Sequence, residues 1–263
     1  MTVPNPDDLR RIAHRAMAQA PSPLLRYQRR GRHLERDGVA FTTQDYAGPG
    51  FNFAAVLGPA PPLDHILDVA RDFFAGCEGG YGILVEADAG HPVEAELKTR
   101  GWPIAEDEPA LVLPFLGEIP PSPAGLEIHH VTTQAGLRDC SSVMNAAFNM
   151  PPELAEKFAP VPASALAPDI AYLVGYCAGR PVAGAMFYGP GGHAGVAGVA
   201  THPEYQRRGF GRALTWAALR EGTARGYSPG VLRAMGISYA MYLGMGFVHV
   251  CNHRTYAVPA ASA

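Results

Sequence analysis

Apolar residues are arranged along this chain in two patterns, a helical spacing and short continuous runs. Between Leu63 and Phe74 they return every third or fourth position, the spacing that places them on one face of an amphipathic helix. Elsewhere they form short runs bounded by glycine and proline, which are typical of buried strands. Helices are predicted at the N-terminus, where Asn5 caps and Pro6 opens the first turn, and over residues 63–74, 92–100, 134–148, 152–158, 211–225 and 238–244.

The strand-like runs fall into two groups separated by a proline-rich stretch, Glu118–Gly125. Proline favours extended backbone and interrupts both helices and strand ladders, so this stretch is predicted to be a linker, residues 118–125. It separates a first domain, residues 1–117, from a second, residues 126–263. Strands are predicted within residues 28–58 and at 81–85, 111–116, 126–131, 171–176, 181–188, 193–200, 231–234, 248–250 and 255–258.

The two halves repeat one order of elements. A strand at residues 81–85 is followed by a helix, Gly101-Trp102 and another strand. The strand at residues 231–234 is likewise followed by a helix, Gly246-Phe247 and a strand. This is a weak internal repeat, and it favours two related domains.

Composition narrows the class of protein. The chain has 263 residues, 48% of them hydrophobic and 17% charged, which suits a packed core and argues against disorder. A net charge of −3 and a pI near 6.4 argue against nucleic acid as a partner. No stretch approaches the roughly 18 apolar residues of a membrane span, and Arg10, Arg11 and Arg15 interrupt any signal core. A cytoplasmic protein without a membrane partner is predicted.

Metal binding is not indicated by the cysteines and histidines. No cysteine lies in a Cys-x-x-Cys pair or at ligand spacing from a histidine, so reduced core thiols are predicted rather than zinc. His129 and His130 are adjacent on a predicted strand and therefore point to opposite faces. The cysteines are Cys77, Cys140, Cys177 and Cys251.

The segment Val199–Leu214 combines a strand end, a proline turn and a glycine-rich loop that opens a helix. Backbone N–H groups at the start of a helix have no acceptor within it, and the helix dipole adds positive character there. A diphosphate is a natural ligand for that geometry. Gly209 and Gly211 allow it to approach the backbone without a Cβ in the way. Positive charge is added by Arg207, Arg208 and Arg212.

Two other phosphate-binding loops do not fit this segment. A dinucleotide fingerprint needs three glycines and a downstream acid, and the loop has two glycines. A P-loop needs Gly-Lys-Ser/Thr, which is absent. An ordinary glycine-containing helix start is the remaining alternative.

Gln206–Gly211 reads Gln-Arg-Arg-Gly-Phe-Gly and resembles the Gln/Arg-x-x-Gly-x-Gly/Ala signature of the GNAT N-acetyltransferase superfamily. Tyr242–Phe247 is similar to the family's Tyr-x-x-x-Gly-Phe. The resemblance spans residues 126–258, whereas the first half looks like a degenerate copy. It implies an α+β (mixed α/β) fold of two GNAT-like domains, each a mixed, mostly antiparallel central sheet flanked by helices, the second one catalytic.

The resemblance also implies a reaction: transfer of an acyl group, acetyl in the first instance, from acetyl-CoA to a primary amine of a small molecule or peptide, without a metal. Backbone groups of Val199 and Thr201 would pair with the pantetheine arm, and a main-chain N–H near Val199 or Ala200 would bind the developing oxyanion. Tyr242 would donate a proton to the leaving thiolate, although Tyr239 shares its helix face. The implied cofactor-binding residues are Val199, Ala200, Thr201, Gln206, Arg207, Arg208, Gly209, Phe210, Gly211 and Arg212.

The general base is left open by the sequence. Many family members carry a carboxylate on the strand before the loop, but residues 194–200 contain none. His193 and Glu204 are candidates, and both are also typical surface residues. The missing carboxylate keeps a second hypothesis open, a non-catalytic acyl-CoA sensor. The acceptor and the oligomeric state, a homodimer included, are not readable.

The first half carries no equivalent phosphate loop. Gly58–Asp64 lies between a predicted strand and helix, but it contains Pro59, Pro61 and Pro62, which have no N–H to donate. This half is predicted not to bind CoA in the same manner and to wall the substrate cleft of the second domain.

Overall fold

The computed structural model describes residues 5–44, 46–87, 89–151, 155, 164, 167–234 and 236–259. It has a mixed α/β fold whose strands pair mostly antiparallel, as predicted. The chain forms two compact units, and they are not contiguous stretches of sequence. Unit 1 contains residues 1–111, 233–239 and 249–263, and unit 2 contains residues 112–232 and 240–248.

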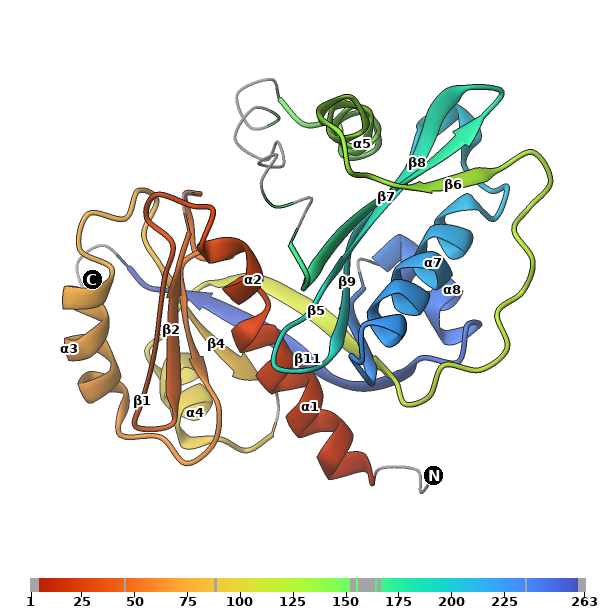
Figure 1. Cartoon of the computed structure of the whole chain (residues 1–263). Helices are drawn as coiled ribbons and strands as arrows, with labels where there is room; N and C mark the ends of the chain where they lie inside the picture. Colours follow the sequence, from red (N-terminus) through yellow and green to blue (C-terminus); the bar gives the residue numbers. More distant parts are fainter. Residues whose placement is uncertain are drawn as a thin grey trace. The chain divides into compact units, whose positions relative to one another are not determined.

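Unit 1 is a layered α/β unit with helices on both faces of its strands (Figure 1). Its strands, in spatial order, are β1 (Arg32–Arg36), β2 (Val39–Thr43), β3 (Phe53–Val56), β4 (Gly82–Glu86), β11 (Val248–Ala257) and β5 (Ile104–Leu113). Its helices are α1 (Pro6–Gln19), α2 (Ser22–Leu25), α3 (Leu63–Phe73) and α4 (Pro92–Thr99). The side chain of Asn5 accepts from the Asp8 N–H at 2.8 Å, which confirms the predicted cap of the first helix.

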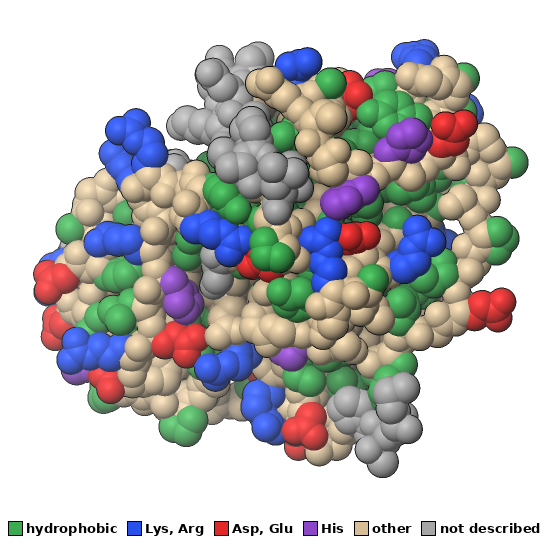
Figure 2. All heavy atoms as spheres, viewed as in Figure 1, with side chains coloured by type: hydrophobic (Ala, Val, Ile, Leu, Met, Phe, Trp, Pro, Cys, Tyr) green, Lys and Arg blue, Asp and Glu red, His purple; other side chains and the backbone are tan. Residues whose placement is uncertain are grey.

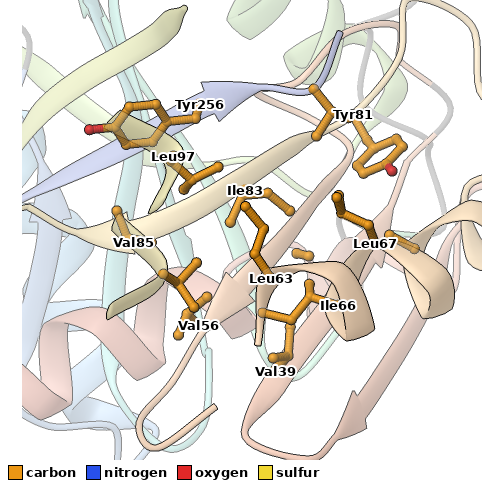
Figure 3. Packing of buried hydrophobic residues seen from close by; sticks show 14 of the residues in the cluster. Val39, Val56, Leu63, Ile66, Leu67, Tyr81, Ile83, Val85, Leu97 and Tyr256 are labelled. Atoms are coloured by element: carbon orange, nitrogen blue, oxygen red, sulfur yellow. The ribbon is translucent and has the colours of Figure 1, made fainter. Parts of the chain in front are cut away.

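The core of unit 1 lies on the two faces of these strands. On one face, Leu63 and Ile66 of α3 pack against Val39 of β2 and Val56 of β3, all of them buried (Figure 3). On the other face, Ala18 of α1 joins a smaller buried cluster that includes Leu84 of β4. The spacing of apolar residues in the sequence thus identified the buried face of α3 correctly.

The last strand was predicted wrongly as two short strands of the second domain. It is one strand, β11, which pairs antiparallel with β4 from His253 opposite Glu86 to Ala257 opposite Gly82. Arg254 of β11 contacts the buried carboxylate of Glu94 at 2.7 Å and that of Asp107 at 2.7 Å. These partners are far away in the sequence, so no local pattern could place the end of the chain in unit 1.

The strand β5 begins at Ile104, before the predicted start at residue 111. Its first half is the acidic run from Glu106 to Glu108, which does not read as a strand because it is charged. Arg233 contacts Glu106 at 3.1 Å and Glu108 at 3.2 Å, so the charges are compensated by a distant residue.

A histidine pair is buried in unit 1. The Nε2–H of His14 on α1 donates to the Val56 carbonyl at 2.5 Å, and the His14 ring lies 5.2 Å from that of His253 on β11. Both ring nitrogens of His253 are buried without a hydrogen-bond partner among the described residues. Burial lowers the pKa of His14, and burial together with the neighbouring His14 and Arg233 lowers the pKa of His253 well below its usual value.

The histidine pair predicts that stability falls as the pH is lowered. In the unfolded chain both rings titrate near pH 6.5. In the fold their pKa values are lower, so below pH 6.5 the unfolded state binds more protons and the stability present above that pH is lost. Each histidine contributes up to about 1.4 kcal/mol per pH unit. Urea unfolding at pH 7.5, 6.5 and 5.5 measures this slope.

A variant pair checks the origin of that slope. His253→Phe removes one titrating group and is expected to reduce the slope, whereas His65→Gln, on the exposed face of α3, is expected to leave it unchanged. An equal slope in the parent chain and in His253→Phe contradicts the assignment.

Unit 2 is a second set of strands with one long helix on each face. The strand order is β10 (Gly230–Arg233), β9 (Ala194–Thr201), β8 (Arg180–Tyr188), β7 (Ile170–Cys177) and β6 (Glu127–His130). The helices α5 (Gln134–Phe148) and α7 (Phe210–Ala224) cover opposite faces, and the short α8 (Tyr239–Leu243) follows β10 (Figure 1). The predicted hairpin and the helix over residues 134–148 are confirmed. The predicted helix at residues 152–158 falls almost wholly outside the described residues.

Candidate functional site

The strand β9 is bent one residue before Val199. Opposite Ala185 of β8, the strand has two residues, Gly198 and Val199, because the pairing shifts between Gly184 and Met186. Gly198 has a φ of +60°, a left-handed conformation that suits glycine in a β-bulge of this kind. A bulge at this place redirects the backbone of Val199 and Ala200, two residues that the sequence assigns to the cofactor.

The edge of β9 that faces β10 is paired over only part of its length. Its parallel pairing with β10 is limited to Ala194 opposite Gly230 and Gly195 opposite Val231. Within the part of the chain that the structure describes, β10 therefore has no register partner for Val196–Thr201. A strand edge without a partner offers N–H and C=O groups to an extended ligand. This part of β9 includes Val199 and Thr201, whose backbone groups the resemblance assigns to the pantetheine arm.

The loop after β9 presents a series of free backbone donors. A short 3-10 turn, η2 (Pro203–Tyr205), is followed by Gln206 and then by α7, whose first closing bond runs from the Ala213 N–H to the Gly209 carbonyl at 3.0 Å. The six amide N–H groups from Arg207 to Arg212 have no acceptor among the described residues. Residues 206–211, predicted as the phosphate-binding loop, therefore have the backbone geometry that an oxyanion ligand needs.

The two glycines of the loop differ in their backbone conformation and surroundings. Gly209 has a φ of +81° and stands at the N-cap of α7 without a side-chain cap. A Cβ on Gly211 would lie 3.4 Å from Thr201 Oγ1 and 3.7 Å from Val199 Cγ1. The start of α7 therefore lies against the end of β9, and the structure brings together the strand and loop residues that the sequence predicts.

Tyr242 lies on α8, which is tied to the start of α7. The guanidinium of Arg212 donates to the carbonyl of Gly244 at 2.6 Å. Tyr242 is 5% exposed and packs edge-on against Phe247 at 5.7 Å. Tyr239 is in a different position, because its hydroxyl bonds His249 Nδ1 at 3.0 Å within unit 1. The structure thus separates the two tyrosines and keeps Tyr242 in the unit that contains the loop.

Comparison with known proteins finds a family similarity for part of the chain. A sequence model of the acetyltransferase (GNAT) family matches residues 140–247, which include β9, the loop, α7 and Tyr242. The sequence is therefore similar to the GNAT acetyltransferase family over residues 140–247. None of the curated proteins matches the sequence.

Solved structures share the fold of nearly the whole chain. A GCN5-related N-acetyltransferase from Kribbella flavida is 20% identical with a TM-score of 0.71, over 95% of this chain and 96% of that chain. Another from Sphaerobacter thermophilus is 14% identical with a TM-score of 0.59, over 97% and 93% of the two chains. A GNAT-family protein from Novosphingobium aromaticivorans is 17% identical with a TM-score of 0.54, over 96% and 97%. At such identities the likeness concerns the fold alone.

The three arginines of the loop at residues 206–212 differ in the contacts that their side chains make. Arg207 is exposed and has a φ of +64°, which is uncommon for a residue with a side chain. Arg208 reaches back to the Glu204 carbonyl at 3.4 Å and lies over the Tyr205 ring. Arg212 holds α8, as described above. Among these, Arg207 has the side chain with fewest ties to the protein.

The structure does not single out either of the two predicted candidates as the general base. Of the two candidates, Glu204 is exposed and lies 3.9 Å from Arg180. His193 precedes β9, at the end of the strand opposite to the loop, and its Nδ1 contacts the Ser228 carbonyl at 3.4 Å. Burial lowers the pKa of His193, so the ring is neutral at pH 7 and keeps a basic nitrogen. The base therefore stays a prediction without a structural assignment.

Sequence reasoning missed a polar contact and an aromatic residue of this unit. The hydroxyl of Tyr176 on β7 donates to Asp139 on α5 at 2.6 Å, and burial together with that carboxylate raises the pKa of Tyr176 to about 12. Tyr205 stacks on the buried Phe210 with ring centroids 6.5 Å apart. Neither contact has a sequence signal, because a loop tyrosine and a strand tyrosine look like ordinary surface and packing residues.

The described residues were compared with the requirements of a metal site and of a membrane-spanning helix. Among the residues described, no three histidine, cysteine or acidic side chains are grouped closely enough to hold a metal ion. No described helix has both the length and the apolar character required for crossing a membrane. On the face drawn in Figure 2, basic and acidic side chains are interspersed rather than gathered by sign.

Proposed function

We propose that this chain is an acyl-CoA-dependent N-acyltransferase that transfers acetyl from acetyl-CoA to a primary amine of a small molecule or peptide. The observation that carries this proposal is the run of six amide N–H groups, Arg207–Arg212, without acceptors among the described residues, at the positive end of α7. The GNAT family match to residues 140–247 supports the reaction class.

The chain's own groups suit each part of the cosubstrate. The diphosphate of coenzyme A is an anion that needs several donors at once, and the start of α7 supplies them. The edge of β9 from Val196 to Thr201 suits an extended arm that carries amide groups, which pantetheine has. Gly211 supports the fit, because a Cβ there would fill the space in front of Thr201. In the proposed complex, the cofactor contacts are those predicted for residues 199–201 and 206–212.

Acyl transfer then needs three things: a polarised carbonyl, a neutral amine and a proton for the departing sulfur. A backbone N–H of Val199 or Ala200, redirected by the bulge at Gly198, suits the developing oxyanion. Tyr242 is the proposed proton donor to the thiolate. The amine loses one proton in the reaction, and because β9 carries no carboxylate, water is the proposed acceptor of that proton.

A turnover assay tests this proposal directly. The chain is incubated with acetyl-CoA and a panel of primary amines, and the release of free CoA thiol is measured. At least one amine is expected to raise thiol release well above the hydrolysis seen without acceptor, and the N-acetyl product is identified by its mass. Tight binding of acetyl-CoA with no amine-dependent thiol release from any acceptor contradicts the enzyme.

That second outcome is the one expected for a non-catalytic acyl-CoA sensor. One observation favours the sensor: β9, from Ala194 to Thr201, carries no carboxylate to act as a base. Retention of Tyr242 beside the loop helix favours the enzyme, because a sensor has no need of a proton donor.

A further inference from the structure

The guanidinium groups of two arginines lie over the ring of one tyrosine, Tyr205, next to the loop. The Arg208 guanidinium lies 5.0 Å from the centre of the Tyr205 ring, and the Arg180 guanidinium lies 5.8 Å from it. The two arginines come from different elements, Arg208 from the loop and Arg180 from the first position of β8. Tyr205 is itself held by stacking on Phe210, which is buried at the start of α7. Tyr205, with the guanidiniums of Arg180 and Arg208 over its ring, is called the platform below.

The fold does not explain why two cations share this platform. The carboxylate of Glu204 lies 3.9 Å from Arg180, and both side chains are about two-thirds exposed, at 67% and 66%. An exposed pair at that distance contributes little to stability. Among the described residues, the one hydrogen bond that the Arg208 side chain donates is to the backbone carbonyl of Glu204, at 3.4 Å. Two positive charges against one negative charge leave an excess that attracts an anion.

The platform lies beyond the end of β9. The His202 N–H, directly after β9, donates to the Val182 carbonyl of β8 at 2.9 Å, which brings the turn at 203–205 beside the start of β8. A ligand arm that runs along β9 and places its diphosphate on residues 207–212 has its nucleotide end at this side of the unit. Coenzyme A carries one more anionic group there, the phosphate on the ribose 3′ oxygen.

We propose that Arg180 and Arg208, on Tyr205, bind the 3′-phosphate of coenzyme A, so that the site selects CoA thioesters over thioesters of a carrier-bound phosphopantetheine, which lacks this group. This inference rests on the proposed function, since it takes the diphosphate position from it. A phosphate dianion suits a pair of guanidiniums, which form charge-assisted hydrogen bonds to its oxygens. Glu204 competes with the phosphate for Arg180.

Binding of two ligands that differ in one phosphate tests the proposal. Dissociation constants of CoA and 3′-dephospho-CoA are measured by calorimetry on the parent chain and on Arg180→Gln, Arg208→Gln, Glu204→Gln and Arg220→Gln. The parent chain is expected to bind CoA about tenfold more tightly than 3′-dephospho-CoA. Arg180→Gln and Arg208→Gln are expected to bring that ratio toward one, and Glu204→Gln to raise it. Arg220, exposed on α7, is the matched control and is expected to keep the parent ratio.

The outcomes separate this inference from the proposed function. Equal affinity of the parent chain for the two ligands, or an unchanged ratio in both Arg180→Gln and Arg208→Gln, overturns the second phosphate site while leaving the diphosphate site intact. Failure of the parent chain to bind either ligand overturns both. Arg180→Gln is the sharper variant, because Arg180 lies outside the predicted diphosphate loop.

Discussion

A Gly211→Val variant is expected to bind acetyl-CoA about 100-fold more weakly than the parent chain. A Cβ on Gly211 would lie 3.4 Å from Thr201 Oγ1, and the branched side chain would extend into the space between the start of α7 and the end of β9. The cosubstrate would be held away from the amides of residues 207–212, and the loss of two charge-assisted hydrogen bonds corresponds to about 3 kcal/mol. Calorimetric titration with acetyl-CoA measures the change.

A matched glycine variant separates lost binding from lost folding. Gly117 belongs to the same unit and has no atoms within 4 Å of an added Cβ, so Gly117→Val is expected to bind acetyl-CoA as the parent chain does. Both variants are checked by thermal unfolding. If Gly211→Val unfolds at the same temperature as the parent chain and binds acetyl-CoA with the same affinity, the proposed position of the diphosphate is wrong.

The second large effect is expected at Tyr242. Tyr242→Phe removes only the hydroxyl and is expected to lower kcat by about 100-fold or more while changing the KM for acetyl-CoA little. The reason is that a proton donor to the leaving thiolate acts in the transition state and contributes little to binding of the thioester. Steady-state thiol release, with the best amine of the panel, gives both constants.

Tyr239→Phe is the control for this result. Tyr239 lies three positions earlier, but its hydroxyl is engaged with His249 at 3.0 Å. Loss of that contact is expected to leave kcat within about threefold of the parent value, since a single hydrogen bond contributes about 1 kcal/mol or less there. A large loss of kcat in Tyr239→Phe together with a normal kcat in Tyr242→Phe would show that Tyr239, not Tyr242, is the proton donor.

Much of unit 2 could be predicted from the sequence because its signals are local. The helix over Gln134–Phe148 was predicted to the residue: its apolar spacing sets the face, and Thr133 at its start accepts from the Gly136 N–H at 3.1 Å. The loop at residues 206–211 was readable because strand, turn and glycine positions follow each other directly. Its free amides follow from the rule that the first N–H groups of a helix have no internal acceptor.

The remaining features depend on contacts between distant residues. The return of β11 to unit 1 depends on partners such as Glu94 and Asp107, which no periodicity connects with Arg254. The guanidinium of Arg212 donates to the carbonyl of Gly244, directly after α8, a contact that no local pattern indicates, and the predicted role of Arg212 toward the cofactor stays a prediction. The bulge at Gly198 has no sequence signal, and only the register with β8 shows it. The predicted roles of residues 1–117, the linker and the oligomeric state stay predictions.

Amide NMR can detect a diphosphate that is held by the backbone amides at the start of α7. Spectra of the ¹⁵N-labelled chain are recorded during titration with 3′-dephospho-CoA, which keeps the diphosphate, and with pantetheine, which lacks it. We expect large shifts of the Arg207–Arg212 amide signals with 3′-dephospho-CoA and small ones with pantetheine. Unchanged signals from these residues at a concentration of 3′-dephospho-CoA that shifts amides elsewhere would contradict it.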